Sequence, residues 1–177
     1  MRPRLLIGRL LAIAAIAAIA GCAFAPPPPA TYAASPRPVR PSETATTPVP
    51  TADGDTVFEI IGLTTGLTTV LGSHAELPAS GSYVRLRVVV SNTGRNSVLL
   101  DTARQLLRTA DGATYAPDPE AMLVKRQPAR AEVGPGNRFE FDLYYDVPAG
   151  AVPVGLRAFG GPTLADFSDT TGTDVPL

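Results

Sequence analysis

Glu140 and Asp142 are two carboxylates separated by a single residue, a spacing that could serve acid–base chemistry. Polar and apolar residues alternate along residues 139–147, which predicts a strand. The two Cα atoms would then lie about 6.7 Å apart on one face, within the range of glycosidase carboxylate pairs. Glycosidases, however, place their two acids across a cleft. Because Tyr144 and Asp146 share the same face, we interpret the pair as solvated strand polarity and keep a glycan hydrolase as the alternative.

Other residue types that support catalysis or metal binding are sparse. His74 is the only histidine and lies in a Gly-Ser-His-Ala-Glu loop, with no Gly-x-Ser-x-Gly motif in the chain. A catalytic triad needs a nucleophile, a base and an orienting group, and a zinc site needs several His or Cys ligands. We therefore expect His74 to be solvated, and we expect no catalytic residue, cofactor or metal. Weak calcium binding is an alternative for a few acids without a spaced loop motif: Asp53, Asp55, Asp166, Asp169 and Asp174.

Cys22 is the only cysteine, and an export signal precedes it. Arg2 and Arg4 give a positive start, and residues 10–20 are all Leu, Ile or Ala. Ile19, Ala20 and Gly21 stand directly before Cys22. Eleven apolar residues are too few for a membrane-spanning helix, which needs about 20. The pattern is that of a signal peptide with a lipobox. It predicts cleavage of residues 1–21 and attachment of diacylglycerol to the Cys22 thiol.

Lipid on Cys22 would hold the exported protein on the outer face of the cell membrane. Each buried methylene contributes about 0.8 kcal/mol, and stable anchoring takes two acyl chains or an equivalent second signal. Two alternatives remain open. The signal could stay uncleaved as an anchor, or cleavage could follow residues 23–25 without lipidation.

Charge and cysteine content exclude several classes of protein. Removal of residues 1–21 takes away three arginines and no acid, which leaves 12 basic and 16 acidic side chains and a charge of −4. No basic cluster stands out, so we do not expect nucleic-acid binding. With Cys22 carrying lipid, no disulfide can form within the chain.

Residues 22–52 are rich in proline, threonine and alanine and almost lack large apolar side chains. Such a segment cannot bury enough surface to offset its ordering entropy, which predicts a disordered tether. Proline keeps it extended at about 3.1 Å per residue, so it could hold a domain several tens of Å from the lipid. O-glycosylation is an alternative for three threonines beside Pro48: Thr44, Thr46 and Thr47.

Residues 53–160 read as short strands separated by Gly, Pro and Asn-x-Gly turns. The clearest strand is 82–92, in which Val and Leu alternate with Arg85 and Arg87, as in a half-buried antiparallel strand. If it pairs beside residues 139–147, cross-strand ion pairs would follow. The pattern predicts an all-β fold, an antiparallel immunoglobulin-like sandwich. Residues 161–177 are predicted to form a flexible tail.

Five segments, in order, resemble a bacterial extracellular domain family that includes a secreted immunoprotective antigen of actinobacteria. The family name refers to a telomeric-repeat-binding factor, although nothing in this chain supports DNA binding. The resemblance implies an immunoglobulin-like sandwich, often on a lipoprotein tether, with no established enzymatic activity and no catalytic motif to transfer. The matching segments are residues 58–63, 83–94, 111–115, 133–136 and 141–148.

These observations favour a non-enzymatic lipoprotein of the cell envelope. Its sandwich would bind another envelope protein or a small ligand through loops or a sheet face. The alternatives are the glycan hydrolase that uses Glu140 and Asp142, and an immunity or assembly factor for a membrane partner.

Overall fold

Strands account for most of the residues that the computed structural model describes, which are 38–74, 76–162 and 171–177. Within these ranges, no helix is long and apolar enough to cross a membrane. The elements in chain order are β1 (Thr44–Ala45), β2 (Thr51–Asp53), β3 (Thr56–Leu71), β4 (Glu76–Asn92), β5 (Val98–Asp101), a 3₁₀ helix (Thr102–Arg104), β6 (Leu106–Thr109), β7 (Thr114–Tyr115), α1 (Pro119–Val124), β8 (Arg130–Val133), β9 (Arg138–Val147), β10 (Pro153–Ala158) and β11 (Thr173–Pro176).

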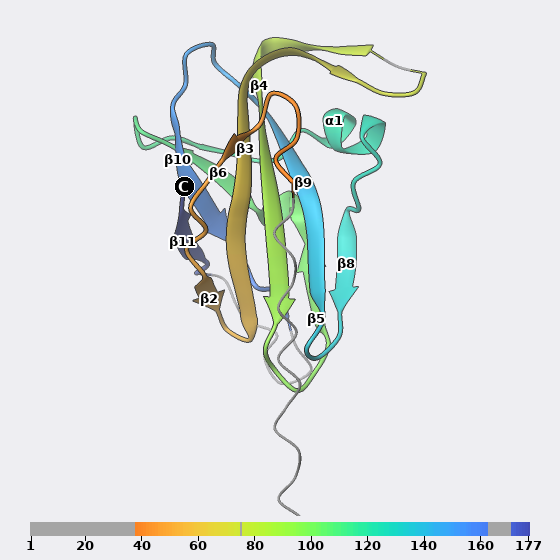
Figure 1. Cartoon of the computed structure of the whole chain (residues 1–177), viewed down its shortest axis with the longest axis vertical. Coiled ribbons are helices and arrows are strands. Elements are labelled where there is room, and N and C mark those ends of the chain that lie inside the picture. Colours follow the sequence, from red (N-terminus) through yellow and green to blue (C-terminus); the bar gives the residue numbers. More distant parts are fainter. Residues whose placement is uncertain (1–37, 75, 163–170) are drawn as a thin grey trace, which may run out of the picture. The chain divides into compact units, whose positions relative to one another are not determined.

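The strands form two main antiparallel sheets. In the first, β1, β3, β4 and β9 follow one another, and β2 also pairs with β3. In the second, the order is β11, β10, β6 and β7, while β5 and β8 make a separate pair. Figure 1 shows β3, β4 and β9 running side by side, with β10, β6 and β11 in a second layer. The predicted all-β antiparallel sandwich is confirmed.

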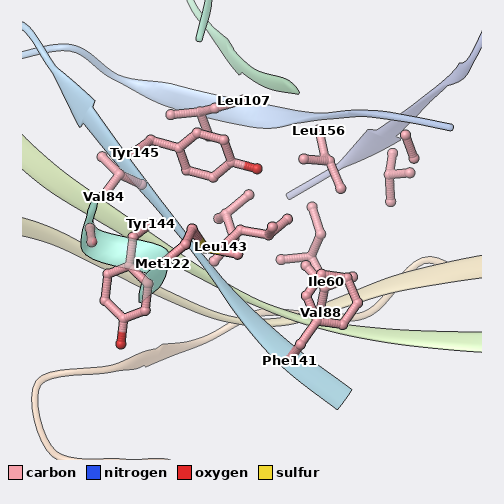
Figure 2. Close-up of a cluster of buried hydrophobic side chains, with 14 of the residues drawn as sticks. Ile60, Val84, Val88, Leu107, Met122, Phe141, Leu143, Tyr144, Tyr145 and Leu156 are labelled. Atoms are coloured by element: carbon pink, nitrogen blue, oxygen red, sulfur yellow. The ribbon is translucent and has the colours of Figure 1, made fainter. Parts of the chain in front are cut away.

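The core lies between the two sheets and is built from alternating apolar residues. The inward side chains of β4 are each at most 1% exposed: Val84, Leu86, Val88 and Val90. Leu107 and Leu156 belong to the second sheet, and Figure 2 shows them on the side of β9 toward which Tyr145 points. Tyr144, the next residue along the chain, points to the opposite side of β9. Both faces of this strand therefore carry buried side chains.

The outer face of β4 is buried as well, which corrects the prediction of a half-buried strand. Arg87 is 3% exposed and Tyr83 is 1% exposed, although both alternate with the core residues. A strand pattern with charged residues on one face usually indicates that this face meets water. Here residues 38–46 cover part of that face, so the charges lie under polypeptide rather than under solvent.

The folded unit begins at Pro38 and not at Asp53. The predicted disordered tether is therefore wrong for residues 38–52, in which β1 and β2 both pair with β3. Backbone pairing and contacts to the sheet offset the ordering entropy that the Pro- and Thr-rich composition alone could not. The predicted signal peptide, Cys22 and the rest of the tether up to residue 37 lie outside the described residues.

The predicted flexible tail is also wrong at its end, because β11 pairs with β10 in the second sheet. Asp53, which is 8% exposed, holds this region from the first sheet. Its carboxylate accepts hydrogen bonds from the Gly160 backbone N–H and the Thr173 hydroxyl, both at 2.6 Å. Burying a carboxylate is costly unless such donors bond to it, so Asp53 is a structural link rather than a free calcium ligand.

The β3–β4 hairpin continues beyond the rest of its sheet and bends over α1 (Figure 1). Three register shifts interrupt the pairing of β3 with β4, and such bulges bend a strand pair. The Lys125 ammonium donates to the Leu71 carbonyl oxygen at 2.9 Å and ties the bent end to the residue that follows α1. Asp118 caps α1 by accepting from the Ala121 N–H at 2.8 Å.

Asp146 holds β4 at the point where the hairpin leaves β9. Its carboxylate accepts from the Ser80 N–H at 2.6 Å and the Gly81 N–H at 3.0 Å. Burial acts to raise the pKa of Asp146, but these backbone N–H groups outweigh it and lower the pKa below its ordinary value.

We expect Asp146→Asn to cost stability at pH 7 and to cost less as the pH falls. A carboxylate whose pKa is lowered by folding stabilises the folded state above its ordinary pKa of about 3.9, and loses that contribution as the pH drops through the lowered value. Urea unfolding at pH 7, 4 and 3 measures the free energy of both chains. An equal difference at all three pH values would show that the charge of Asp146 contributes nothing.

Candidate functional site

Residues 38–46, which we call the strap, cross the outer face of the sheet formed by β3, β4 and β9 (orange in Figure 1). Only β1 pairs with the sheet through its backbone, with Thr44 opposite Leu63 and Ala45 opposite Gly62. The Thr46 hydroxyl donates to the Ile60 carbonyl oxygen at 2.5 Å. The strap is therefore held mainly by its side chains.

A tight turn brings the two charged residues of the strap together. The Glu43 N–H donates to the Arg40 carbonyl oxygen at 3.1 Å, with Pro41 and Ser42 at the two central positions. Proline favours the first central position of a type II turn, and the second requires a positive φ. Ser42 has φ 62° and pays the steric cost of this conformation. Arg40 and Glu43 thus enter the sheet face as one unit.

Arg40 contacts both carboxylates that the sequence analysis singled out. Its Nη1 lies 2.6 Å from Asp142 Oδ2, and its Nη2 lies 3.1 Å from Glu140 Oε1. The two carboxylate side chains are only 9% and 10% exposed. One guanidinium therefore bridges the pair from above.

Glu43 contacts the two arginines of β4. Its Oε2 lies 3.3 Å from Arg85 Nη2, and its Oε1 lies 3.1 Å from Arg87 Nη1. The Glu43 side chain is 1% exposed and lies directly over Gly62, where a Cβ would collide with the carboxylate. Glycine within a strand often marks such a close approach.

Arg87 joins the two halves of the cluster. Its Nε lies 3.7 Å from Glu140 Oε1, and its Nη1 donates to the Pro38 carbonyl oxygen at 3.2 Å. In the register of β4 with β9, Arg87 is opposite Asp142, which confirms the expected pairing of the two strands. The expected solvation is wrong, because the strap covers the charges. We call the six residues the strap cluster: Arg40, Glu43, Arg85, Arg87, Glu140 and Asp142.

The strap cluster pairs three guanidinium groups with three carboxylates. Burial acts to lower the pKa of Arg40, but its hydrogen bond with Asp142 raises it overall, so this group stays protonated. Burial raises the pKa of Tyr144 on the same face. Two carboxylates bridged by one protonated arginine are placed for ion pairing, whereas a glycosidase needs them on either side of a substrate.

The other predicted residues lie apart from the strap cluster. Asp174 pairs with Arg157 and with Arg108, the latter at 2.9 Å. His74 has no place in the cluster, and within the described ranges no group of three or more His, Cys, Asp or Glu side chains could hold a metal ion. Asp166 and Asp169 lie outside those ranges.

The sequence analysis missed Arg40 and Glu43, although one signal could have found them. Only three charged residues occur between positions 23 and 52, namely Arg37, Arg40 and Glu43. Two of the three belong to the strap cluster. Isolated charges in an otherwise neutral proline-rich segment, together with Gly62 inside a strand, were the available evidence for docking.

Comparisons with known proteins identify a family but assign no activity. A family model described as "Domain of unknown function (DUF4352)" matches residues 50–166, so the match begins after the strap. A conserved hypothetical protein from Bacillus anthracis is 13% identical with a TM-score of 0.45, over 58% of this chain and 78% of that chain. The secreted protein MPT63 from Mycobacterium tuberculosis is 21% identical with a TM-score of 0.42, over 68% and 88%. No curated protein matches the chain.

Proposed function

This chain belongs to the DUF4352 family, and on that premise we propose that it is an exported envelope lipoprotein, anchored through Cys22, whose sandwich is a non-catalytic interaction domain. The observation that carries the second half of this proposal is the strap cluster. Glu140 and Asp142 are the carboxylates best spaced for hydrolysis, and both contact Arg40 beneath the strap. Their charges hold the strap on the outer face of the sheet.

The anchoring half of the proposal rests on the N-terminal sequence. Cys22 follows a charged start, a short apolar run and small residues, which is the pattern of a processed lipoprotein. Because the folded unit begins at Pro38, the tether consists of residues 23–37 rather than reaching to residue 52. At the rise of about 3.1 Å per residue that proline-rich segments favour, fifteen residues would reach about 45 Å. The sandwich would therefore work close to the membrane surface.

Replacing Cys22 with Ala should abolish the incorporation of labelled fatty acid and release the processed chain from the membrane fraction. Cys22 carries the only thiol in the chain that can form the thioether, and on this proposal its acyl chains are what holds the cleaved protein on the membrane. Fractionation of cells fed a labelled fatty acid measures both effects. Phe24→Ala, two residues further on, is the matched control and should keep label and location. A processed Cys22→Ala chain that stays in the membrane would refute lipid anchoring.

The interaction half has its own test, which does not depend on the anchor. Photo-crosslinking in intact cells, followed by purification and mass spectrometry, should recover a specific envelope protein. Crosslinkers placed on the sandwich surface and, as a control, within residues 23–37 separate binding by the domain from proximity along the tether. Equal recovery from both positions would argue against binding by the domain.

A further inference from the structure

The face beneath the strap has hydrogen-bonding capacity that the strap does not use. Within the described residues, Arg85 Nε, Arg87 Nε and Asp142 Oδ1 are buried and make no hydrogen bond. Arg87 and Asp142 are only 3% and 7% exposed. Buried polar atoms without a hydrogen bond are costly, and most folded proteins avoid them. The strap is therefore an imperfect complement to the face that it covers.

The strap is also weakly integrated into the fold. Its backbone pairing is limited to the two residues of β1, and Ser42 holds a strained left-handed conformation. Residues 47–50, which join the strap to β2, are all exposed and include two prolines. Segments with few backbone bonds and exposed connections open locally at low free-energy cost.

The family match includes the sheet face beneath the strap but not the strap itself. The match begins at residue 50 and includes the four cluster residues of the sheet, whereas Arg40 and Glu43 lie before it. The sheet presents two arginines and two carboxylates, and the strap adds one charge of each sign opposite them. The sheet face is therefore a charged surface on which the strap binds as an extended peptide of complementary charge.

We propose that the outer face of β3, β4 and β9 is a docking site for an extended segment of a partner protein, and that the strap is its built-in occupant. The inference rests on the proposed interaction function. The partner segment carries a basic residue three positions before an acidic one, as Arg40 and Glu43 do. It also supplies acceptors for Arg85 Nε and Arg87 Nε and a donor for Asp142 Oδ1.

A partner protein fits this face better than a second copy of the chain. The strap of a second copy would leave the same three polar atoms without hydrogen bonds. It would also compete with the attached strap, whose effective concentration is in the millimolar range for a short linker. Only a segment that satisfies the remaining polar atoms gains enough to displace the strap.

The test uses the full chain with Cys22→Ala and a fluorescein-labelled synthetic peptide of residues 38–49 as the probe. Arg40→Ala in the protein weakens the attached strap and leaves the sheet face unchanged. Fluorescence anisotropy should show at least tenfold tighter peptide binding to Arg40→Ala than to the chain with its native strap. A peptide that carries the same Arg to Ala change should lose this gain. Thermal unfolding confirms that each variant folds.

A disulfide lock provides the matched control and covers failure of Arg40→Ala to fold. Thr44→Cys and Leu63→Cys face each other in an antiparallel pair, within the Cα spacing of disulfides. Oxidation should abolish peptide binding and reduction should restore it, while Ser42→Gly, which relieves strain and favours closure, should weaken it. Binding that persists after oxidation, or no binding to a folded Arg40→Ala chain, overturns the docking site. Concentration-dependent dimers on size exclusion would instead identify a second copy as the occupant and overturn the partner.

Because the assay uses the unanchored chain, its result is independent of lipid attachment. Failure of the peptide to bind, combined with a specific crosslinked partner in cells, would place the interaction elsewhere on the sandwich and leave the proposed function standing. Failure of both experiments would remove the interaction function itself.

Discussion

Arg87→Ala should destabilise the sandwich by about 3–5 kcal/mol, the range for a buried ion pair that loses one partner. Arg87 is 3% exposed, and the Glu43 side chain that it contacts is 1% exposed. Removal of the guanidinium leaves the Glu43 carboxylate paired with Arg85 and the Glu140 carboxylate paired with Arg40. Urea unfolding followed by far-UV circular dichroism measures the change.

Arg138→Ala is the matched control on the same sheet. Arg138 Nη2 lies 2.9 Å from Glu59 Oε2 across β9, β4 and β3, but its side chain is 48% exposed. Exposed pairs contribute about 0–1 kcal/mol because water screens the charges and both side chains lose entropy. Similar losses for Arg87→Ala and Arg138→Ala would show that the strap cluster is as well solvated as a surface pair.

The double replacement of Arg87 and Glu43 by Met separates the cost of an unpaired charge from the loss of packing. Buried ion pairs can often be replaced by apolar residues of similar volume at little cost. We expect the double variant to recover at least half of the stability lost in Arg87→Ala. If it is less stable than the single variant, packing of the Arg87 stem, and not the unpaired carboxylate, dominates.

The sandwich could be predicted from sequence because alternation along a strand is local information. Residues 82–92 show which side chains face the core, and the pairing of this strand with residues 139–147 follows from their complementary charges. The segment that covers the outer face of the sheet cannot be identified from local sequence. The strap contacts residues about 100 positions away, and its composition alone predicts disorder. The candidate site could therefore not be predicted, because it joins the strap to β4 and β9, which lie far from it in the sequence.

The ends of the folded unit were missed for a related reason. Proline, threonine and glycine are typical of segments that do not fold alone, and both residues 38–52 and β11 are rich in polar or small side chains. β11 is ordered by pairing with β10 and by Asp53, which accepts a hydrogen bond from Thr173, whereas residues 38–52 are ordered by the pairing of β1 and β2 with β3. Propensity describes a segment by itself, whereas these segments are stabilised by a surface that the rest of the chain provides.

Gln105→Leu should cost about 3 kcal/mol or more of unfolding free energy, although leucine is an apolar side chain of similar size. Gln105 is 0% exposed, and its Nε2 donates to the carbonyl oxygens of Asp101 and Phe159 at 2.9 and 3.0 Å. Its Oε1 accepts from the Phe159 N–H at 3.0 Å. Leucine would leave these three backbone groups without their partner, and each buried unsatisfied group costs about 1–3 kcal/mol.

Tyr145→Phe is the control that isolates a single hydrogen bond at the same residue. The Tyr145 hydroxyl donates to the Gln105 carbonyl oxygen at 2.9 Å, and its removal should cost about 1 kcal/mol. For a domain of this size, the midpoint temperature of thermal unfolding, Tm, should fall by about 10 °C in Gln105→Leu and by about 3 °C in Tyr145→Phe. Gln105 links the end of β5 to the residue after β10, so its amide joins two sheets by donating to two backbone carbonyl oxygens and accepting from one backbone N–H. Equal losses in the two variants would mean that packing around Tyr145 and Leu107, and not the amide, holds the end of β10 against the core.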